Sequence, residues 1–139
     1  MKRFLAPILL IVFLFPSLAL GQGVSIYDLV ERNGLFYEKS TNVPFSGKID
    51  EGLWRGLFKN GKSEGLWVRY SVGGQLSYKG TYKDGEWDGP WVGYWNNGQL
   101  QMKGTYKDGE QNGPWVAYHK DGTVNDALTG TFKDGVKVE

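Results

Sequence analysis

Apolar and polar positions alternate along the stretch LQMKGTYK, from Leu100 to Lys107. Every second residue is apolar or glycine, and the residues between them are polar. A period of two predicts a β-strand with one apolar and one polar face. The stretch LSYKGTYK, from Leu76 to Lys83, follows the same rule one repeat earlier. The chain therefore contains copies of one strand.

An Asp-Gly pair follows each of these strands, at Asp84 and Asp108. This pair between alternating segments is a strong signal for a β-hairpin. We expect a further glycine, Gly89 or Gly113, to close the loop, and a second strand to begin at the next proline. Another turn follows this second strand, marked in successive copies by Gly73-Gly74, Asn97-Gly98 and Asp121-Gly122.

The two-strand unit repeats at a nearly fixed spacing. Its leading glycines are at positions 56, 80, 104 and 130, which are 24, 24 and 26 residues apart. Such a period is typical of stacked units that each contact their neighbours. The sequence therefore predicts an all-β fold, an elongated array of antiparallel β-hairpins in an open, twisted, single-layer sheet or solenoid.

The second strand of each unit carries the motif Trp-Val-x-Tyr, beginning at Trp67, Trp91 and Trp115. In an extended strand the valine and tyrosine share one face, and the tryptophan lies on the other. We expect the valine and tyrosine face to form the core. The tryptophans would then lie beside the positions that differ between copies.

The ends of the chain are less regular. Asn33-Gly34 separates two short apolar segments and predicts a two-residue hairpin between residues 29–32 and 35–38. We expect residues 22–52 to form this hairpin and a cap. Residues 53–139 would form the repeats and end in a half-repeat.

Residues 1–21 have the pattern of a secretory signal peptide. A basic start and an apolar run from Phe4 to Phe15 precede Ala19-Leu20-Gly21, whose small residues suit cleavage before Gln22. The run is short for a membrane span of about 20 residues. We therefore expect export to the periplasm, the cell envelope or the medium.

Composition narrows the function. The chain has no cysteine, so an exported form would be stabilised without disulfides. Removing Lys2 and Arg3 with the leader leaves 14 of the 16 basic residues against 15 acidic ones. This balance and the lack of a basic stripe argue against nucleic acid as a partner.

Catalytic chemistry has few candidates here. The single histidine, His119, occupies a position that varies between copies, and no serine stands in a strand-to-helix elbow. Asp84 and Glu86 could serve a secreted hydrolase, but tight turns need such carboxylates in any case. The segment from Asp84 half-matches a calcium loop, yet its twelfth residue is Trp95 instead of glutamate. We predict no enzyme activity, no metal and no cofactor.

These motifs resemble the MORN repeat family, and more closely its bacterial variant form. The matching segments are Gly-Thr-Tyr-Lys-Asp-Gly at 80 and 104, Gly-Pro-Trp-Val-x-Tyr at 89 and 113, and Asn-Gly-Gln-Leu at 97. The resemblance covers about residues 29–138. It implies an elongated run of hairpins that binds proteins or membranes. Some bacterial relatives are described as YwqK-type antitoxins, so an antitoxin-like partner protein is one alternative.

Aromatic residues are the best candidates for a binding surface. Trp87 stands where other copies have serine or glutamine, and Trp95 where they have serine or His119. Residues that depart from the repeat are not required by the scaffold, and tryptophans suit binding hot spots. Alternatively, they close gaps between units. The candidate surface is Trp87, Trp91, Trp95 and His119.

The predicted function is a non-enzymatic, exported module for protein–protein interaction or scaffolding in a bacterial envelope. Glycan or cell-wall binding through the tryptophans is an alternative. So is binding to an anionic membrane surface through the lysines that recur at one repeat position, Lys83, Lys107 and Lys133.

Overall fold

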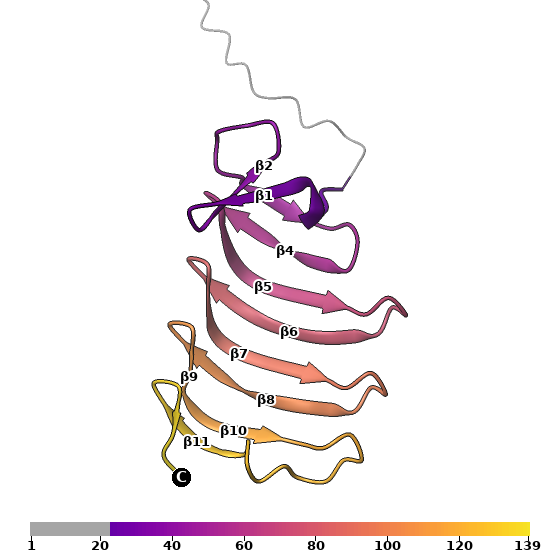
Figure 1. The fold of residues 1–139 in the computed structure, drawn as a ribbon, viewed down its shortest axis with the longest axis vertical. Coiled ribbons are helices and arrows are strands. Elements are labelled where there is room, and N and C mark those ends of the chain that lie inside the picture. The colour runs from indigo at the N-terminus through magenta and orange to yellow at the C-terminus, as the bar shows by residue number, and fades with distance from the viewer. Residues whose placement is uncertain (1–22) are drawn as a thin grey trace, which may run out of the picture.

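The computed structural model describes residues 23–139, which form an almost purely β structure (Figure 1). The predicted leader, residues 1–21, lies outside the described residues. A short 3₁₀ helix, η1 (Ile26–Asp28), comes first. The strands are β1 (Leu29–Arg32), β2 (Leu35–Glu38), β3 (Gly47–Ile49), β4 (Trp54–Lys59), β5 (Lys62–Tyr70), β6 (Leu76–Lys83), β7 (Glu86–Tyr94), β8 (Leu100–Lys107), β9 (Glu110–Gln111), β10 (Gly113–Ala117), β11 (Gly130–Lys133) and β12 (Val136–Lys137).

One long antiparallel sheet contains every described strand except β1 and β2. Its order is β12-β11-β10-β8-β7-β6-β5-β4-β3, and β9 pairs with β8 at the edge of this path. Neighbours in the sheet are thus neighbours along the chain, as Figure 1 shows. The predicted all-β array of antiparallel hairpins in an open single layer is confirmed. Among residues 23–139, no helix is long and apolar enough to cross a bilayer.

Tight two-residue turns close the hairpins on one side of the sheet. The first turn residue has φ between 47° and 52°, and the glycine after it has φ between 76° and 87°. Two successive positive φ values define the turn that suits the right-handed twist of paired strands. The turns are Asn33-Gly34, Asn60-Gly61, Asp84-Gly85, Asp108-Gly109 and Asp134-Gly135. The hairpins predicted at Asn33-Gly34, Asp84-Gly85 and Asp108-Gly109 are confirmed.

The second glycine of each unit has a different role from the expected one. Strand β7 begins at Glu86, directly after the turn, so Gly89 lies within the strand and does not close the loop. Tyr82 pairs with Trp87 and Gly80 pairs with Trp91, so three residues of β7 face one residue of β6. Gly89, with φ 119°, is therefore part of a β-bulge. A bulge bends its strand and increases the local twist.

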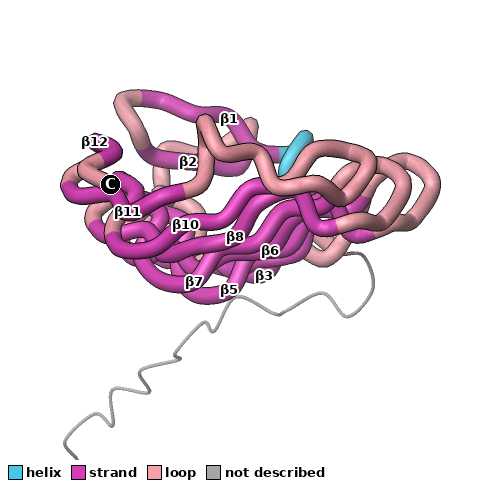
Figure 2. Tube along the Cα trace, turned by 90° about the horizontal axis from the view of Figure 1, so that it is seen from below, coloured by secondary structure: helices cyan, strands magenta, loops and turns pink. Residues whose placement is uncertain are grey.

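The bent strands give the sheet the shape of a trough (Figure 2). The β1–β2 hairpin and η1 lie over its open side at the N-terminal end. Beneath them is a buried cluster of Leu29, Phe45, Ile49, Phe58 and Trp67. The N-terminal segment thus covers the first strands of the trough, while the following strands keep this face open.

The expected assignment of the core to the valine and tyrosine face is wrong. Trp67 and Trp115 are only 2% exposed, whereas Val68 and Val116 are half-buried on the opposite face. The tryptophan face lines the trough, and its rings pack against one another. Period-two alternation separates the two faces of a strand, but it does not say which of them is the inner one.

Glycines on neighbouring strands make room for the buried indoles. Trp67 pairs with Gly80 on the strand that follows. It also leans over Gly56 on the strand before, where an added Cβ would lie 2.2 Å from its Cδ2. A Cβ at Gly104 would lie equally close, 2.2 Å from Cδ2 of Trp115. The leading glycines Gly56, Gly80 and Gly104 are therefore required by packing across strands.

Replacing Gly104 by alanine should lower the free energy of unfolding by about 1–3 kcal/mol, because overpacking a closed contact forces side chains or backbone to move. Trp115 has little freedom to yield, since its Nε1 donates to the Thr105 carbonyl at 3.1 Å. Urea denaturation measures the change.

The matched control is Gly73→Ala, in an exposed turn where the nearest atom to the new Cβ would be Ser71 Oγ at 3.9 Å. Equal denaturation midpoints for Gly104→Ala and Gly73→Ala would contradict the role of glycine in packing.

Candidate binding surfaces

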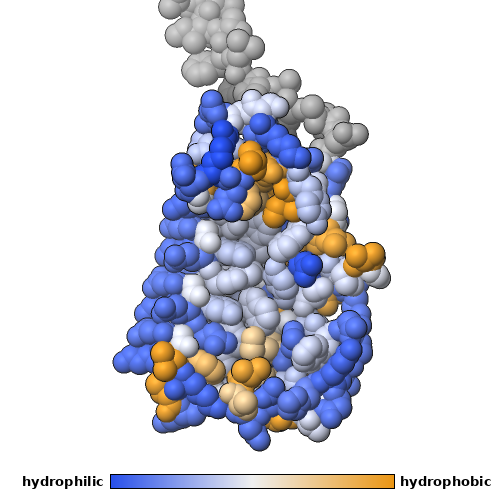
Figure 3. All heavy atoms as spheres, viewed as in Figure 1, coloured by the Kyte–Doolittle hydropathy of each residue, from blue (hydrophilic) through white to orange (hydrophobic). Residues whose placement is uncertain are grey.

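A continuous ladder of aromatic rings lines the trough. Its rings contact one another across the strands at centroid distances from 3.7 to 6.3 Å. We call this surface the aromatic trough. It consists of Trp54, Trp67, Tyr78, Tyr82, Trp87, Trp91, Tyr106 and Trp115. In Figure 3 the surface appears as a pale region facing the viewer, below the N-terminal cap.

The units that contain Trp67 and Trp115 are the first and third of the array, and they share one ring geometry. Phe58 meets Trp67 edge to face at 4.9 Å and 79°, and Tyr106 meets Trp115 at 4.9 Å and 76°. In both units the tryptophan Nε1 donates to a backbone carbonyl of the preceding strand, at Leu57 and Thr105. This arrangement is the basic packing of the repeat.

The middle unit departs from this geometry. Trp87 stacks on Tyr82 at 3.7 Å and 27°, in the place where the other units put their repeat tryptophan. Trp91 instead stacks on Tyr78 at 5.9 Å and 26°. Its ring lies over Gly93, where an added Cβ would be 2.5 Å from Cη2. Trp87 and Gly93 are thus two linked departures from the repeat.

Two positions that differ between copies therefore have different roles in the middle unit: one adds a ring, and the other makes room for a ring. Gly93 stands where other units have Arg69 and Ala117, and it admits the displaced ring of Trp91. Trp87 and Trp91 both remain half-buried, so each ring packs on the scaffold and also faces the open trough. Packing on the scaffold and exposure to the trough coexist at these residues.

Trp95 and His119 lie away from the centre of the trough, at the turns on the opposite edge from the Asp-Gly pairs. The indole of Trp95 donates from Nε1 to the Tyr118 carbonyl of the next unit at 3.0 Å. Asn97 in the same turn donates to the Lys120 carbonyl, also at 3.0 Å. Trp95 therefore links two neighbouring units by a hydrogen bond. His119 is exposed in the neighbouring turn.

A hollow of about 440 Å³ adjoins Trp95. Its lining combines aromatic rings with amide and cationic groups, including Tyr78, Arg69 and Lys120. Arg69 also lies 5.4 Å from the ring of Trp54, and its buried Nε has no hydrogen-bond partner among the described residues. The site offers ring faces together with hydrogen-bond donors.

Burial changes the acidity of three tyrosines in the trough. It raises the pKa of Tyr82 to about 12, with smaller contributions from Tyr78 and Tyr106 nearby. Burial also raises the pKa of Tyr78, which the charge of Arg69 partly offsets, and that of Tyr106. These hydroxyls stay protonated at neutral pH and can donate hydrogen bonds to a ligand.

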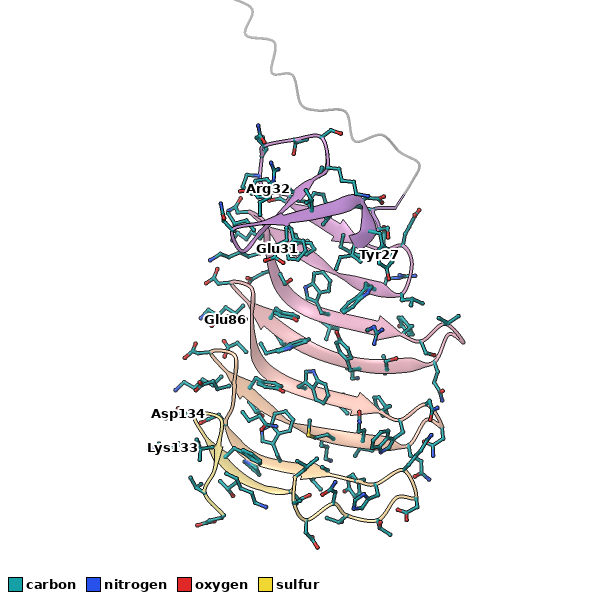
Figure 4. The ribbon with its side chains drawn as sticks, viewed as in Figure 1. Tyr27, Glu31, Arg32, Glu86, Lys133 and Asp134 are labelled. Atoms are coloured by element: carbon teal, nitrogen blue, oxygen red, sulfur yellow. The ribbon has the colours of Figure 1, made fainter. Side chains whose placement is uncertain are left out.

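The Asp-Gly turns form a charged rim along one side of the trough, where Figure 4 labels Glu86, Lys133 and Asp134. The recurring lysines of the sequence lie here, exposed and next to the turn aspartates. A backbone hydrogen bond links successive turns: the amide of Gly109 donates to the Trp87 carbonyl at 2.8 Å. The rim carries both signs of charge.

The face opposite the trough carries an apolar groove that was not predicted from the sequence. It has a volume of about 600 Å³ and spans three units. Its lining includes Leu66, Pro90, Val92, Pro114 and Val116. The signal was the valine of each Trp-Val-x-Tyr motif, which alternation had correctly placed opposite the tryptophan.

A comparison with protein-family models gives a match over part of the chain. Residues 87–108 match the MORN repeat variant, and MORN repeats generally serve protein interaction or scaffolding. This segment begins one residue into β7 and includes the following turn and all of β8, so nearly one full unit carries the match. No curated protein shows significant similarity to the chain. The matched family has no catalytic signature, and within residues 23–139 no cluster of His, Cys, Asp and Glu could hold a metal ion.

The link between Trp87 and Gly93 predicts a non-additive pair of substitutions. Gly93→Ala alone should cost about 1–3 kcal/mol because its Cβ strikes Trp91. In a Trp87→Gln background the cost should shrink, because Trp91 can then take the position that Trp115 has beside Gln111 and Ala117. Urea denaturation of the four proteins gives a coupling energy, expected at roughly 0.5–3 kcal/mol. Additive effects would show that the two departures are independent.

The free energy of unfolding should fall in alkaline solution, because burial raises the pKa of the trough tyrosines in the folded state. The folded-state pKa of Tyr82 is raised from 10.0 to about 12. The folded state therefore holds its proton where the unfolded state loses it, and stability is full below pH 10 and declines as pH rises toward 12. Tyrosinate absorbance and urea midpoints measure both effects.

Tyr82→Phe is the matched variant, since Phe58 and Phe132 occupy the equivalent position. It should reduce the alkaline loss of stability. Simultaneous ionisation of all 8 tyrosines near pH 10 would contradict the protected environment of the trough.

Proposed function

We propose that this chain is a non-enzymatic, exported interaction module whose aromatic trough binds a protein partner. The observation that carries the proposal is the open row of half-buried rings in the middle units. Tyr78, Tyr82, Trp87, Trp91 and Tyr106 are held by ring stacking and by the sheet, while one side of each stays accessible. The match to the MORN repeat variant supports the same role, because MORN repeats generally serve protein interaction or scaffolding.

Preorganised rings suit a binding surface for an energetic reason. An aromatic side chain contributes a large contact area, and it loses little conformational entropy when it is already packed in place. Trp87 is stacked between Tyr82 at 3.7 Å and Tyr106 at 6.3 Å, so its orientation is set before a partner arrives. A rigid, elongated row of such rings favours an extended contact over a small enclosed ligand.

Glycan binding is a second candidate, supported by the hollow beside Trp95. Sugar rings stack on aromatic faces, and their hydroxyls need hydrogen-bond partners such as those of Gln75, Gln101 and Arg69. The hollow lies at the turn edge and shares Tyr78 with the row of rings, but Trp87 does not line it. Substitutions at Trp87 and Trp95 therefore distinguish the two candidates.

The test compares Trp87→Gln with Trp95→Ser, each of which introduces a residue found at the equivalent position of another unit. Photo-crosslinking in envelope extracts, followed by affinity measurement with the captured protein, should show about a 30-fold loss for Trp87→Gln. This is the effect of removing a hot spot worth about 2 kcal/mol. Val72→Gln, at a side chain that is 93% exposed in a turn, is the control.

Equal affinity of Trp87→Gln and the control for the captured partner would contradict the proposed role of the trough. Retention on peptidoglycan or a sugar array that disappears in Trp95→Ser but persists in Trp87→Gln would favour the glycan candidate instead.

Export is the remaining part of the proposal, supported by the leader pattern of residues 1–21. N-terminal sequencing of the protein from fractionated cells should give a chain that begins at Gln22, located outside the cytoplasm. An intact N-terminus in the cytoplasmic fraction would contradict export and would revive the antitoxin-like alternative.

A further inference from the structure

A row of alternating cations and valines crosses the face opposite the aromatic trough. Strand register places each valine directly beside a cation on the neighbouring strand. The cations recur with the 24-residue period of the repeat, as do the valines. In order across the sheet the row is Arg55, Val68, Lys79, Val92, Lys103 and Val116.

A second, more apolar row runs beside the first. Leu66 pairs with Thr81, and Pro90 pairs with Thr105. Leu66 is 60% exposed, and Pro90 and Pro114 are exposed as well. The part of the first row from Lys79 to Val116 and the second row together line the groove of about 600 Å³ described above, which we call the outer groove.

The two flanks of the outer groove differ in charge: one carries cations alone, and the other carries both signs. Lys79 and Lys103 belong to the valine row and are exposed. On the other flank, toward the Asp-Gly turns, lies Glu64, whose carboxylate accepts a bond from the Asp84 amide at 3.0 Å. Asp88 occupies the equivalent position one repeat later. A partner would therefore meet positive charge along one flank of an apolar strip and charges of both signs along the other, where Lys83 lines a hollow together with Glu64.

The spacing of the cations defines the partner further. Neighbouring strands are about 4.8 Å apart, so cations on every second strand recur about every 9.6 Å. An α-helix lying across the strands rises about 1.5 Å per residue, so residues seven apart are separated by about 10.5 Å. Flexible lysine side chains easily absorb this difference. Acidic residues at i and i+7 would face Lys79 and Lys103.

The lining favours an amphipathic helix over other acidic ligands. A bare polyanion would leave the leucine, valine and proline side chains without apolar contact. Proline-rich segments dock in grooves lined by aromatic rings, whereas amphipathic helices place an apolar stripe in a hydrophobic groove. Trp91 and Trp115 also border the outer groove, but their rings pack on each other in the trough. The apolar side chains that alternation places on the groove face, such as Leu66 and Val92, are aliphatic.

We propose that the outer groove binds an amphipathic α-helix of a protein partner, with its apolar stripe on Leu66, Pro90 and Pro114 and its acidic flank along Lys79 and Lys103. This inference rests on the proposed function, since it assumes a protein partner, but it assigns a second surface. The two faces of the sheet would then bind different parts of a partner, or two partners.

The probe is a labelled synthetic helical peptide of about 20 residues, with an apolar stripe and glutamates every seventh residue on one flank. A second peptide has the same composition, with the glutamates moved to the side opposite the stripe. Fluorescence anisotropy with the purified full chain measures both affinities. The first peptide should bind at least about fivefold more tightly.

Charge reversal on the protein provides the matched control. The double variant Lys79→Glu/Lys103→Glu should weaken binding of the first peptide about tenfold. Lys83→Glu/Lys107→Glu makes the same change of net charge on the rim and should alter affinity by less than about twofold. Urea midpoints of both variants should stay near that of the parent chain, because all four lysines are exposed.

Three outcomes would overturn the inference: equal losses for the two double variants, equal binding of the two helical peptides, or no binding of either. Preference for an extended, proline-rich acidic peptide would overturn it as well. Trp87→Gln should bind the helical peptide normally, because Trp87 lies on the other face. If the trough binds no partner, the helical peptide should still bind the outer groove. If the outer groove binds no peptide, capture of a partner that depends on Trp87 should still occur.

Discussion

The structure depends on one contact, an indole lying on the glycine backbone of a neighbouring strand. A single-layer sheet has no second layer to bury its apolar side chains, so they must be buried within one face. Gly56 and Gly104 allow this because they have no Cβ where Trp67 and Trp115 lie. Burying 150–250 Å² of tryptophan at about 25 cal/mol per Å² contributes about 4–6 kcal/mol per indole as an upper estimate.

The same contact explains why the period is so regular. Each tryptophan lies between the leading glycines of two successive units, as Trp91 does between Gly80 and Gly104. A change of register by one residue would place a side chain beneath the ring and turn the aromatic row to the other face. Units can therefore be added along the array only in steps that preserve the pairing. The outer face is free of this constraint and can carry other chemistry.

The middle unit shows how a repeat gains an individual surface without losing its packing. Trp87 takes the stacking position on Tyr82, and Trp91 moves over Gly93. Neither substitution alone would preserve both contacts. The result is the densest group of half-buried rings in the trough. The opposite face, with Lys79 and Lys103 among valines, remains independent of this exchange.

Local features of the sequence were enough to predict the strands, the Asp-Gly and Asn-Gly turns and the stacked architecture. These depend on alternation and on positive φ at pairs such as Asp84-Gly85, which neighbouring residues dictate. The candidate residues Trp87 and Trp91 do meet in the trough, but the role of Trp95 as a tie to Tyr118 required the next unit to be in place.

Only the tertiary structure decided which face is the inner one, because alternation assigns residues to two faces and treats those faces alike. The choice follows from the bulge at Gly89, which bends the strand, and from rings that lean over glycines of another strand. Both are relations between strands, so no local pattern around Val92 could reveal that its side chain faces outward.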